Sequence, residues 1–316
     1  MKIGVVGPGA MGCLLAGKLA LAGNEVVLLD HYPERVRVLN RLGVRIESDN
    51  QVVKVKIPVT LDAEVLSSSE VILICVKAYD TLTVARTLQG LAKGPYFLTL
   101  QNGVGNIETL GKYLPKKKIL GGITSHGATD LGSGRVRHAG RGETFIGFGF
   151  DKGKREPRVD QIRDQILERL SQAGFSTRWV PDIENLIWSK LLINIGINAL
   201  TALTRLPNGK LVEFNGVKEI LEEAVREGME IGLKKGIQFI QADPVAQVKK
   251  VCRLTATNVS SMLQDILKKS RTEIDFINGV IVREGRRYGT PVPVNSLLTR
   301  LVKTIEQSYA QTVAAC

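Results

Sequence analysis

The side chains with the clearest capacity for chemistry stand in one apolar stretch, residues 188–203. Lys190, Asn194 and Asn198 follow one another at intervals of four residues. On a helix this spacing places all three on one face, one above the other. An ammonium group and two carboxamides are costly to bury unless something bonds to them. The spacing favours a polar stripe that lines a substrate cleft; the alternative is a lysine that reaches solvent and asparagines that bond neighbouring helices.

A second group of polar residues lies nearer the C-terminus. Asn258 and Ser261 offer hydrogen-bond donors and acceptors, and Glu273 and Asp275 add carboxylates. Charged residues on helices are usually solvated, so their spacing alone assigns no role to Glu273.

The N-terminal residues contain a glycine-rich turn between an expected strand and an expected helix. Residues 2–6 form an apolar run typical of a buried strand, residues 10–22 have a helical pattern, and a second strand ends at Asp30. The turn between the first two consists of Gly7, Pro8, Gly9, Ala10, Met11 and Gly12. A Gly-x-Gly-x-x-Gly turn in this setting predicts a dinucleotide site.

Each glycine of the turn has its own expected task. Gly7 allows the tight turn, Gly9 lets the backbone approach a pyrophosphate, and Gly12 lets the helix pack on the strand. The N–H groups at the start of the helix then face the phosphates. The alternative is a tight turn without a ligand.

Three further apolar runs, residues 71–76, 97–101 and 119–124, predict central parallel strands that are buried on both faces. Lys77 follows the first, Asn102 follows the second, and the third ends at Thr124. Ligands of open α/β sheets bind outside the carboxyl ends of the strands. We therefore expect these residues to lie with Asp30 at one edge of the sheet.

The remaining patterns indicate two domains. Residues 44–48 and 52–59 alternate around Asp49-Asn50, which predicts a hairpin, and residues 144–148 and 176–180 predict two late strands. From Asp182 onward only helical patterns follow. The sequence therefore predicts an α/β protein, in which an N-terminal Rossmann-type doubly wound sheet (residues 1–180, dinucleotide-binding) is followed by an all-α C-terminal domain (residues 181–316, substrate or cap domain).

The composition is that of a globular protein with a basic balance. The 316 residues include 43 Lys and Arg against 31 Asp and Glu, a formal net charge of +12. The basic residues are spread along the chain, so the charge favours attraction of small anions over binding of nucleic acid. The one long apolar stretch contains Lys190, Asn194 and Asn198, and no signal peptide is evident. We expect a cytoplasmic protein that does not associate with a membrane.

Cysteine and histidine give no indication of a metal site. Cys13, Cys75, Cys252 and Cys316 are scattered, and the chain has 3 histidines. Cys13 and Cys75 stand in apolar surroundings, which favours buried free thiols over metal ligands or nucleophiles.

The order and spacing of these motifs resemble those of the ketopantoate reductase (2-dehydropantoate 2-reductase) family. The resemblance spans both domains. It rests on the glycine turn, Val76-Lys77-Ala78, Gln101-Asn102-Gly103-Val104-Gly105, Thr124-Ser125-His126, the Trp188-x-Lys190 helix with its two asparagines, Pro207-Asn208-Gly209, Ser260-Ser261-Met262-Leu263-Gln264-Asp265, and the segment from Arg271-Thr272-Glu273 to Asn278-Gly279.

The resemblance implies an activity and roles for individual residues. The activity is hydride transfer from NAD(P)H to the C2 carbonyl of 2-dehydropantoate, giving (R)-pantoate in pantothenate and coenzyme A biosynthesis. Lys190 resembles the catalytic general acid, which Glu273 would orient or tune. The expected substrate-binding residues are Asn102, Lys190, Asn194, Asn198, Asn208, Asn258 and Ser261. The expected cofactor-binding residues, beside the six of the turn, are Asp30, His31, Lys77, Asn102, Ala128 and Glu273.

The cofactor preference is open between two arguments. NADP(H) is the default of the family, whose NADPH-preferring members commonly carry an arginine just after the second strand. Here the strand ends at Asp30-His31, with Arg35 and Arg37 further along. An acid at this point usually bonds the ribose 2′-hydroxyl and repels a 2′-phosphate, which favours NAD(H).

Two rival functions remain at this level. One is a related reductase that acts on another 2-oxo or 3-oxo acid; the other is a dinucleotide-binding regulator without turnover. The expected partner in the enzyme readings is a small 2-oxo acid. A homodimer would form through the helical domain, although the sequence leaves the oligomeric state open.

Overall fold

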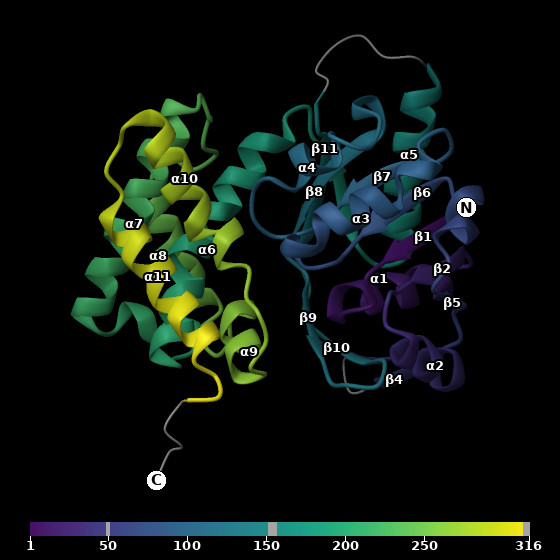
Figure 1. Cartoon of the computed structure of the whole chain (residues 1–316), viewed down its shortest axis with the longest axis horizontal. Coiled ribbons are helices and arrows are strands. Elements are labelled where there is room, and N and C mark those ends of the chain that lie inside the picture. The colour runs from purple at the N-terminus through teal and green to yellow at the C-terminus, as the bar shows by residue number, and fades with distance from the viewer. Residues whose placement is uncertain (49–50, 151–156, 312–316) are drawn as a thin grey trace. The chain divides into compact units, whose positions relative to one another are not determined.

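The computed structural model describes residues 1–48, 51–150 and 157–311 of the chain. The chain forms two compact units (Figure 1), of which the first consists of Met1–Gln101 and Gly105–Ile183 and the second of Asn102–Val104 and Glu184–Cys316. The second unit includes three residues that the sequence reading left within the first domain. The Val104 N–H donates to the Phe276 carbonyl oxygen at 3.0 Å, and this bond explains their place.

The first unit is built on an eight-stranded sheet. The strands are, in spatial order, β12 (Ser176–Trp179), β11 (Glu143–Phe148), β8 (Ile119–Thr124), β7 (Tyr96–Thr99), β6 (Val71–Ile74), β1 (Lys2–Val6), β2 (Glu25–Leu29) and β5 (Val59–Thr60). All neighbours are parallel except β8 and β11, which are antiparallel. The chain leaves β1 toward β2 on one side and later returns to β6 on the other, so β1 lies at the topological switch point.

Helices cover both faces of this sheet. The helices of the unit are α1 (Ala10–Leu21), α2 (Pro33–Leu42), α3 (Thr81–Thr87), α4 (Asn106–Leu110) and α5 (Pro157–Gln172). The alternating side chains of β6 show why: Val71 and Leu73 belong to the core shared with α1 and α5, and Ile72 and Ile74 to the core shared with α3 and α4. The expected strand that is buried on both faces is confirmed, and with it the doubly wound sheet.

The hairpin expected from residues 44–59 belongs to a second sheet, of spatial order β4 (Gln51–Val55), β3 (Val44–Ser48), β10 (Arg135–Gly140) and β9 (Gly127–Asp130). Strands β3 and β4 pair antiparallel from Val44–Val55 to Ser48–Gln51, as expected. The expected turn residues Asp49 and Asn50 lie outside the described residues. Helix α1 packs against β3, β9 and β10 as well as against the main sheet.

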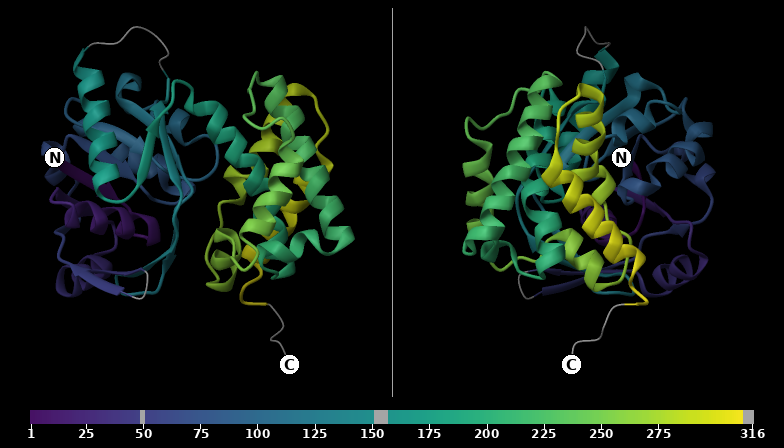
Figure 2. Two further views of the ribbon diagram at one scale, coloured as in Figure 1. Left: turned by 180° about the vertical axis from the view of Figure 1, so that it is seen from behind. Right: turned by 60° about the vertical axis from the view of Figure 1, so that its left-hand side comes forward.

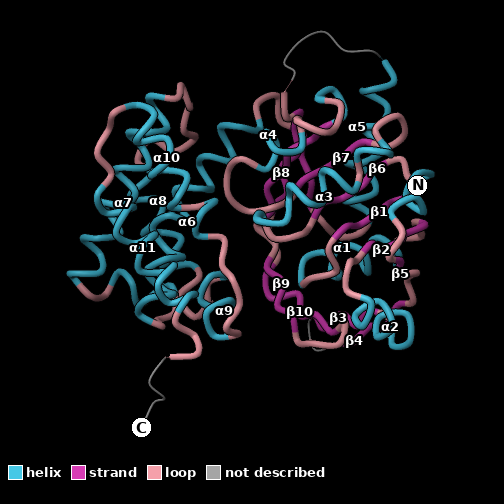
Figure 3. The backbone as a smooth tube through the Cα atoms, in the orientation of Figure 1, coloured by secondary structure: helices cyan, strands magenta, loops and turns pink. Residues whose placement is uncertain are grey.

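The described part of the second unit is helical, and Figure 3 shows its helices joined by loops. The helices are α6 (Ile183–Thr204), α7 (Asn215–Lys234), α8 (Pro244–Leu254), α9 (Ser261–Leu267), α10 (Asn278–Tyr288) and α11 (Pro293–Gln307), with short 3₁₀ turns at Asn208–Val212 and Ile274–Phe276. The views in Figure 2 show them as a bundle. The expected change from α/β to all-α along the chain is therefore confirmed.

Helix α6 is the core helix of the second unit. At Gly196 it packs so closely on its neighbours that a Cβ would lie 2.8 Å from a methyl of Val248 on α8 and 2.9 Å from one of Val225 on α7. Its length and apolar composition would also suit a membrane span, but 67% of the apolar window is buried inside the structure. A core helix has the same composition, and the packing at Gly196 identifies α6 as one.

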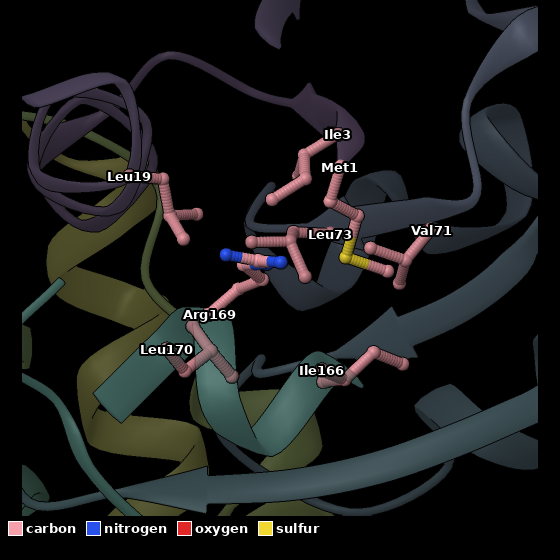
Figure 4. A pocket seen from close by; sticks show the side chains of 8 residues that line it. All are labelled: Met1, Ile3, Leu19, Val71, Leu73, Ile166, Arg169 and Leu170. Atoms are coloured by element: carbon pink, nitrogen blue, oxygen red, sulfur yellow. The ribbon is translucent and has the colours of Figure 1, made fainter. Parts of the chain in front are cut away.

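A small cavity in the first unit lies where β1 and β6 begin. It is lined by Met1, Ile3, Leu19, Val71, Leu73, Ile166, Arg169 and Leu170 (Figure 4). The lining is apolar apart from Arg169. Because the glycine turn follows the other end of β1, this cavity is a feature of how α1 and α5 pack and lies away from the candidate dinucleotide site.

Candidate active site

The glycine turn leaves β1 at the switch point and leads directly into α1. Gly7 has a φ of +91°, and a Cβ there would lie 2.5 Å from a methyl of Val76. A Cβ on Gly12 would lie 2.1 Å from the Gly7 carbonyl oxygen. The fold itself therefore requires both glycines.

Gly9 differs from the other two glycines of the turn. A Cβ at Gly9 would meet nothing within 4 Å. Gly9 is also the N-cap of α1, and no side chain caps this helix end. An open backbone at the start of a helix is what a pyrophosphate needs for close approach. The turn therefore fits a dinucleotide by a criterion that does not depend on the sequence pattern.

Asp30 follows directly after β2, and its carboxylate accepts hydrogen bonds from neighbouring residues of the protein. Its side chain is 0% exposed and bonds both Nε and Nη2 of Arg35, the latter at 2.6 Å. The backbone N–H groups of His31 and Tyr32 also donate to Asp30 Oδ1, at 2.7 and 3.3 Å. The guanidinium of Arg35 stacks over the Tyr32 ring, with Cζ 4.9 Å from the ring centroid. The acid expected to bond a ribose thus serves to hold an arginine at the tip of β2.

The ends of β6 and β7 are tied together by Gln101. Its Nε2 donates to the Val76 carbonyl oxygen at 3.0 Å and to Thr81 Oγ1 at 2.8 Å. Lys77 follows directly after Val76, at the carboxyl edge, as expected. Ala128 is part of β9, where it pairs with His138 of β10, so it belongs to the second sheet.

In the second unit, Lys190 donates from Nζ to Asn102 Oδ1 at 3.1 Å. These two residues are 88 positions apart in the sequence. Burial lowers the pKa of Lys190 from its usual 10.5 to about 8, although the negative charge of Glu273 acts in the opposite direction. Glu273 is itself 5% exposed. The structure therefore places the Lys190 ammonium against the Asn102 amide, within the electrostatic influence of the buried Glu273 carboxylate.

The other expected substrate residues of the second unit lie either on helices α6 and α9 or in the segments before α7 and α9. Asn194 is half-buried and Asn198 is buried on α6, and Ser261 opens α9. Asn208 is 7% exposed, and its Nδ2 donates to Thr255 Oγ1 at 3.0 Å. Its backbone N–H donates to the carbonyl oxygen of the exposed Asn258, also at 3.0 Å. The side chain of Asn208 thus bonds the loop before α9.

Three residues that make tertiary hydrogen bonds were not predicted as site residues: Arg35 and Gln101 in the first unit, and Thr201 in the second. Arg35 was noted only as lying further along the chain, Gln101 only as part of a motif, and Thr201 not at all. Thr201 follows Asn198 by three residues, so extending the helical spacing by one more step would have found it. No local pattern marks the partners of Arg35 and Gln101.

Within residues 1–48, 51–150 and 157–311, no group of three or more His, Cys, Asp or Glu side chains is placed to hold a metal ion. Cys13 and Cys252 are buried free thiols, and Cys75 is a half-buried one. Cys316 lies outside the described residues. Burial raises the pKa of both Cys13 and Cys75 to about 12, so neither thiol is activated as a nucleophile.

A doubly wound sheet with an open helix terminus at its switch point, joined to a helical unit that holds a lysine of lowered pKa, indicates a dinucleotide-dependent enzyme of the Rossmann class. Comparison with known proteins narrows this class. The family model described as "Ketopantoate reductase PanE/ApbA" matches residues 3–149, and its C-terminal counterpart matches residues 182–306.

Individual relatives agree with the family models. The chain is 36% identical to the 2-dehydropantoate 2-reductase of Halobacterium salinarum, over 97% of this chain and 99% of that protein. A PanE/ApbA family ketopantoate reductase from Ralstonia eutropha has a TM-score of 0.89 at 31% identity, covering 98% of this chain and all of the other. The ternary structure of D-mandelate dehydrogenase with NADH and anilino(oxo)acetate also has a TM-score of 0.89, at 27% identity and 98% coverage of this chain and 100% of that one.

The chain belongs to the ketopantoate reductase family. It is accordingly an oxidoreductase that depends on a nicotinamide cofactor and acts on a small molecule.

Proposed function

We propose that this chain is a 2-dehydropantoate 2-reductase, which converts the C2 carbonyl of 2-dehydropantoate into the hydroxyl of (R)-pantoate. The observation that carries the proposal is the hydrogen bond between Lys190 and Asn102, in a chain that matches a curated enzyme of this activity over nearly its whole length. The reaction adds a hydride to the carbonyl carbon and a proton to the carbonyl oxygen. The bound reduced nicotinamide supplies the hydride.

Lys190 supplies the proton. A pKa of about 8 leaves the ammonium largely protonated at pH 7, yet makes it a better acid than an ordinary lysine. Asn102 Oδ1 accepts one of its N–H bonds and so orients the ammonium. As charge develops on the carbonyl oxygen, the same ammonium stabilises the alkoxide before it transfers the proton.

Glu273 keeps this lysine charged. Burial alone favours the neutral amine, and the nearby carboxylate opposes that tendency. We assign donors for the substrate carboxylate and hydroxyl to Asn194, Asn198 and Ser261. Asn208 acts indirectly, because its side chain bonds Thr255 in the loop that leads to Ser261.

The occupied carboxylate of Asp30 changes the argument about the cofactor. Arg35 compensates its charge, so the repulsion of a 2′-phosphate that favoured NAD(H) is weakened. The bidentate contact uses two of the five N–H donors of the guanidinium, whose side chain is 41% exposed. We propose that Arg35 supplies the positive charge for a 2′-phosphate and that NADPH is preferred. His31 and Lys77 remain predicted cofactor contacts.

A second candidate function is the reduction of a different 2-oxo acid. The structural likeness to D-mandelate dehydrogenase favours it, because the fold of that protein serves a 2-hydroxy acid with an aromatic side chain. The two candidate substrates differ in the group that is bonded to the carbonyl carbon, opposite the carboxylate.

The expectation of cytoplasmic location and that of a homodimer through the helical unit remain predictions.

The test is a steady-state assay that follows the loss of reduced-nicotinamide absorbance. Purified protein is given 2-dehydropantoate or phenylglyoxylate, each with NADPH and with NADH. We expect kcat/KM to be highest for 2-dehydropantoate with NADPH. Higher kcat/KM for phenylglyoxylate would select the second candidate, and cofactor binding without turnover of either acid would contradict both.

A further inference from the structure

Helix α6 carries a fourth polar side chain on the face that holds Lys190. Thr201 is three residues after Asn198 and continues the polar stripe by almost one helical turn. It is 0% exposed. None of the roles assigned above uses this hydroxyl.

The Thr201 hydroxyl links two helices through a chain of hydrogen bonds. The Leu263 N–H donates to Ser260 Oγ at 3.1 Å, and Ser260 Oγ lies 2.6 Å from Thr201 Oγ1. Thr201 Oγ1 in turn lies 3.0 Å from the carbonyl oxygens of Ile197 and Asn198. When Ser260 donates to Thr201 and Thr201 donates to a carbonyl oxygen, both of these hydroxyls donate one hydrogen bond and accept another.

This chain of bonds sets where α9 begins. Ser260 is the N-cap of α9, and Ser261 is its first residue. The far end of the preceding loop is held separately, since the Gly209 N–H donates to the Ala256 carbonyl oxygen at 3.0 Å. Thr201 is thus the contact on α6 that holds the end of the loop next to Ser261.

We propose that Thr201 is a positioning residue for the substrate. Its hydroxyl holds Ser260, and through Ser260 it sets the distance between Ser261 on α9 and the asparagines on α6. The proposal rests on the proposed function, because it assumes that Ser261 and the asparagines bind the 2-oxo acid.

The test compares Thr201→Val with Thr201→Ser in the full-length protein. Valine keeps the β-branched shape and removes the hydroxyl, whereas serine keeps the hydroxyl. One hydrogen bond corresponds to roughly a tenfold change in an equilibrium constant, so we expect Thr201→Val to raise the KM for 2-dehydropantoate about tenfold. We expect kcat to stay within about threefold and Thr201→Ser to restore the KM to within about threefold.

Thr204→Val is the matched control. Thr204 is on the same helix, and its hydroxyl donates to the Leu200 carbonyl oxygen at 2.7 Å, within α6. We expect this variant to keep the KM of the unaltered protein. If Thr201→Val does not fold, Ser260→Ala removes the same contact from its other side and should raise the KM similarly. An unchanged KM in a folded Thr201→Val or Ser260→Ala variant would overturn the proposal.

Hydrogen exchange separates failure of this inference from failure of the proposed function. We expect Thr201→Val, but not Thr204→Val, to accelerate amide exchange in peptides that cover residues 258–267. If the unaltered protein does not reduce 2-dehydropantoate, the proposed function fails, and exchange alone then decides whether Thr201 holds α9. Equal exchange in both threonine variants would overturn that contact.

Discussion

The two units present their functional groups in opposite ways. In the first, a turn of backbone at a strand end forms the candidate site, and Gly9 can carry a Cβ without touching the protein. In the second, the candidate site consists of side chains on a core helix, such as Lys190 bonded to Asn102. We therefore expect ligand binding and folding in the first unit to depend on different glycines. In the second unit, we expect ligand binding to depend on side chains of α6.

The largest expected effect is that of Lys190→Ala. Loss of both the proton donor and the alkoxide-stabilising charge should lower kcat by about a thousandfold or more. The dissociation constant of the cofactor should change by less than about threefold, because the glycine turn is in the other unit. Stopped-flow turnover and a fluorescence titration with NADPH measure the two quantities.

Lys218→Ala is the control for this variant. Lys218 donates to Asn215 Oδ1 near the start of α7 and has no role in the proposed chemistry. Turnover of Lys190→Ala that matches the control would remove the lysine from the mechanism.

Gly9→Ala and Gly12→Ala test the separation of folding and binding in the first unit. A Cβ at Gly9 meets nothing, so we expect an unchanged melting temperature and an NADPH dissociation constant at least about tenfold higher. A Cβ at Gly12 would lie 2.1 Å from the Gly7 carbonyl oxygen, and such overpacking costs about 1–3 kcal/mol or more of stability. Calorimetry and NADPH titration measure both. Equal cofactor affinity in Gly9→Ala and the unaltered protein would refute the assigned role of Gly9.

The pH dependence of the reduction tests the charge state of Lys190. The general acid must be protonated, and its pKa is about 8. We expect kcat/KM to be level below pH 8 and to fall about tenfold per pH unit above it. The oxidation of pantoate should show the opposite slope, because it needs the neutral amine. A profile that stays level to pH 10 would mean that Lys190 does not titrate as proposed.

Arg35→Ala should change the choice of cofactor. Losing a charge that pairs with a phosphate should reduce the ratio of kcat/KM for NADPH to that for NADH by about tenfold. Arg37→Ala is the control, since Arg37 is on the same helix and pairs with Glu34. If this ratio of kcat/KM values is the same for Arg35→Ala and the control, Arg35 does not bind the 2′-phosphate, and Asp30 would then favour NADH.

The smallest expected effect concerns the stability of the first unit. His126 is buried with its Nδ1 2.9 Å from His138 Nε2. Burial, and then the positive charges of His138 and Arg141, lower its pKa below the usual 6.5. As the pH falls, His126 therefore becomes protonated at a higher pH in the unfolded chain than in the folded protein. The stability that the neutral ring contributes is complete above pH 6.5 and declines as the pH falls toward the folded-state pKa.

His126→Gln should weaken that acid dependence. We expect a smaller drop in melting temperature between pH 7 and pH 5.5 than in the unaltered protein. An equal drop in His126→Gln and in the unaltered protein would show that His126 does not contribute.

Much of the fold follows from local patterns. The runs around Val71 and Phe97 predicted buried parallel strands, and the loss of strand patterns after Asp182 predicted the helical second unit. These patterns can be recognised because burial on one face imposes a fixed period on neighbouring residues, and burial on both faces produces a continuous apolar run. The second sheet was not predicted, because β3 pairs with β10 across about 90 residues, a separation at which periodicity carries no information.

The candidate site divides in the same way. The sequence by itself determined the glycine turn, the polar stripe on α6 and the residues at the strand ends, because each depends on spacing within one element. Only the tertiary structure decided that Asp30 holds Arg35, that Asn208 bonds Thr255, that Lys190 meets Asn102 and that Thr201 holds Ser260. A hydrogen bond joins whichever donors and acceptors the fold brings within about 3 Å, and for three of these four contacts the partners are far apart in the chain. In the fourth, between Asp30 and Arg35, the spacing did not reveal that the carboxylate turns inward.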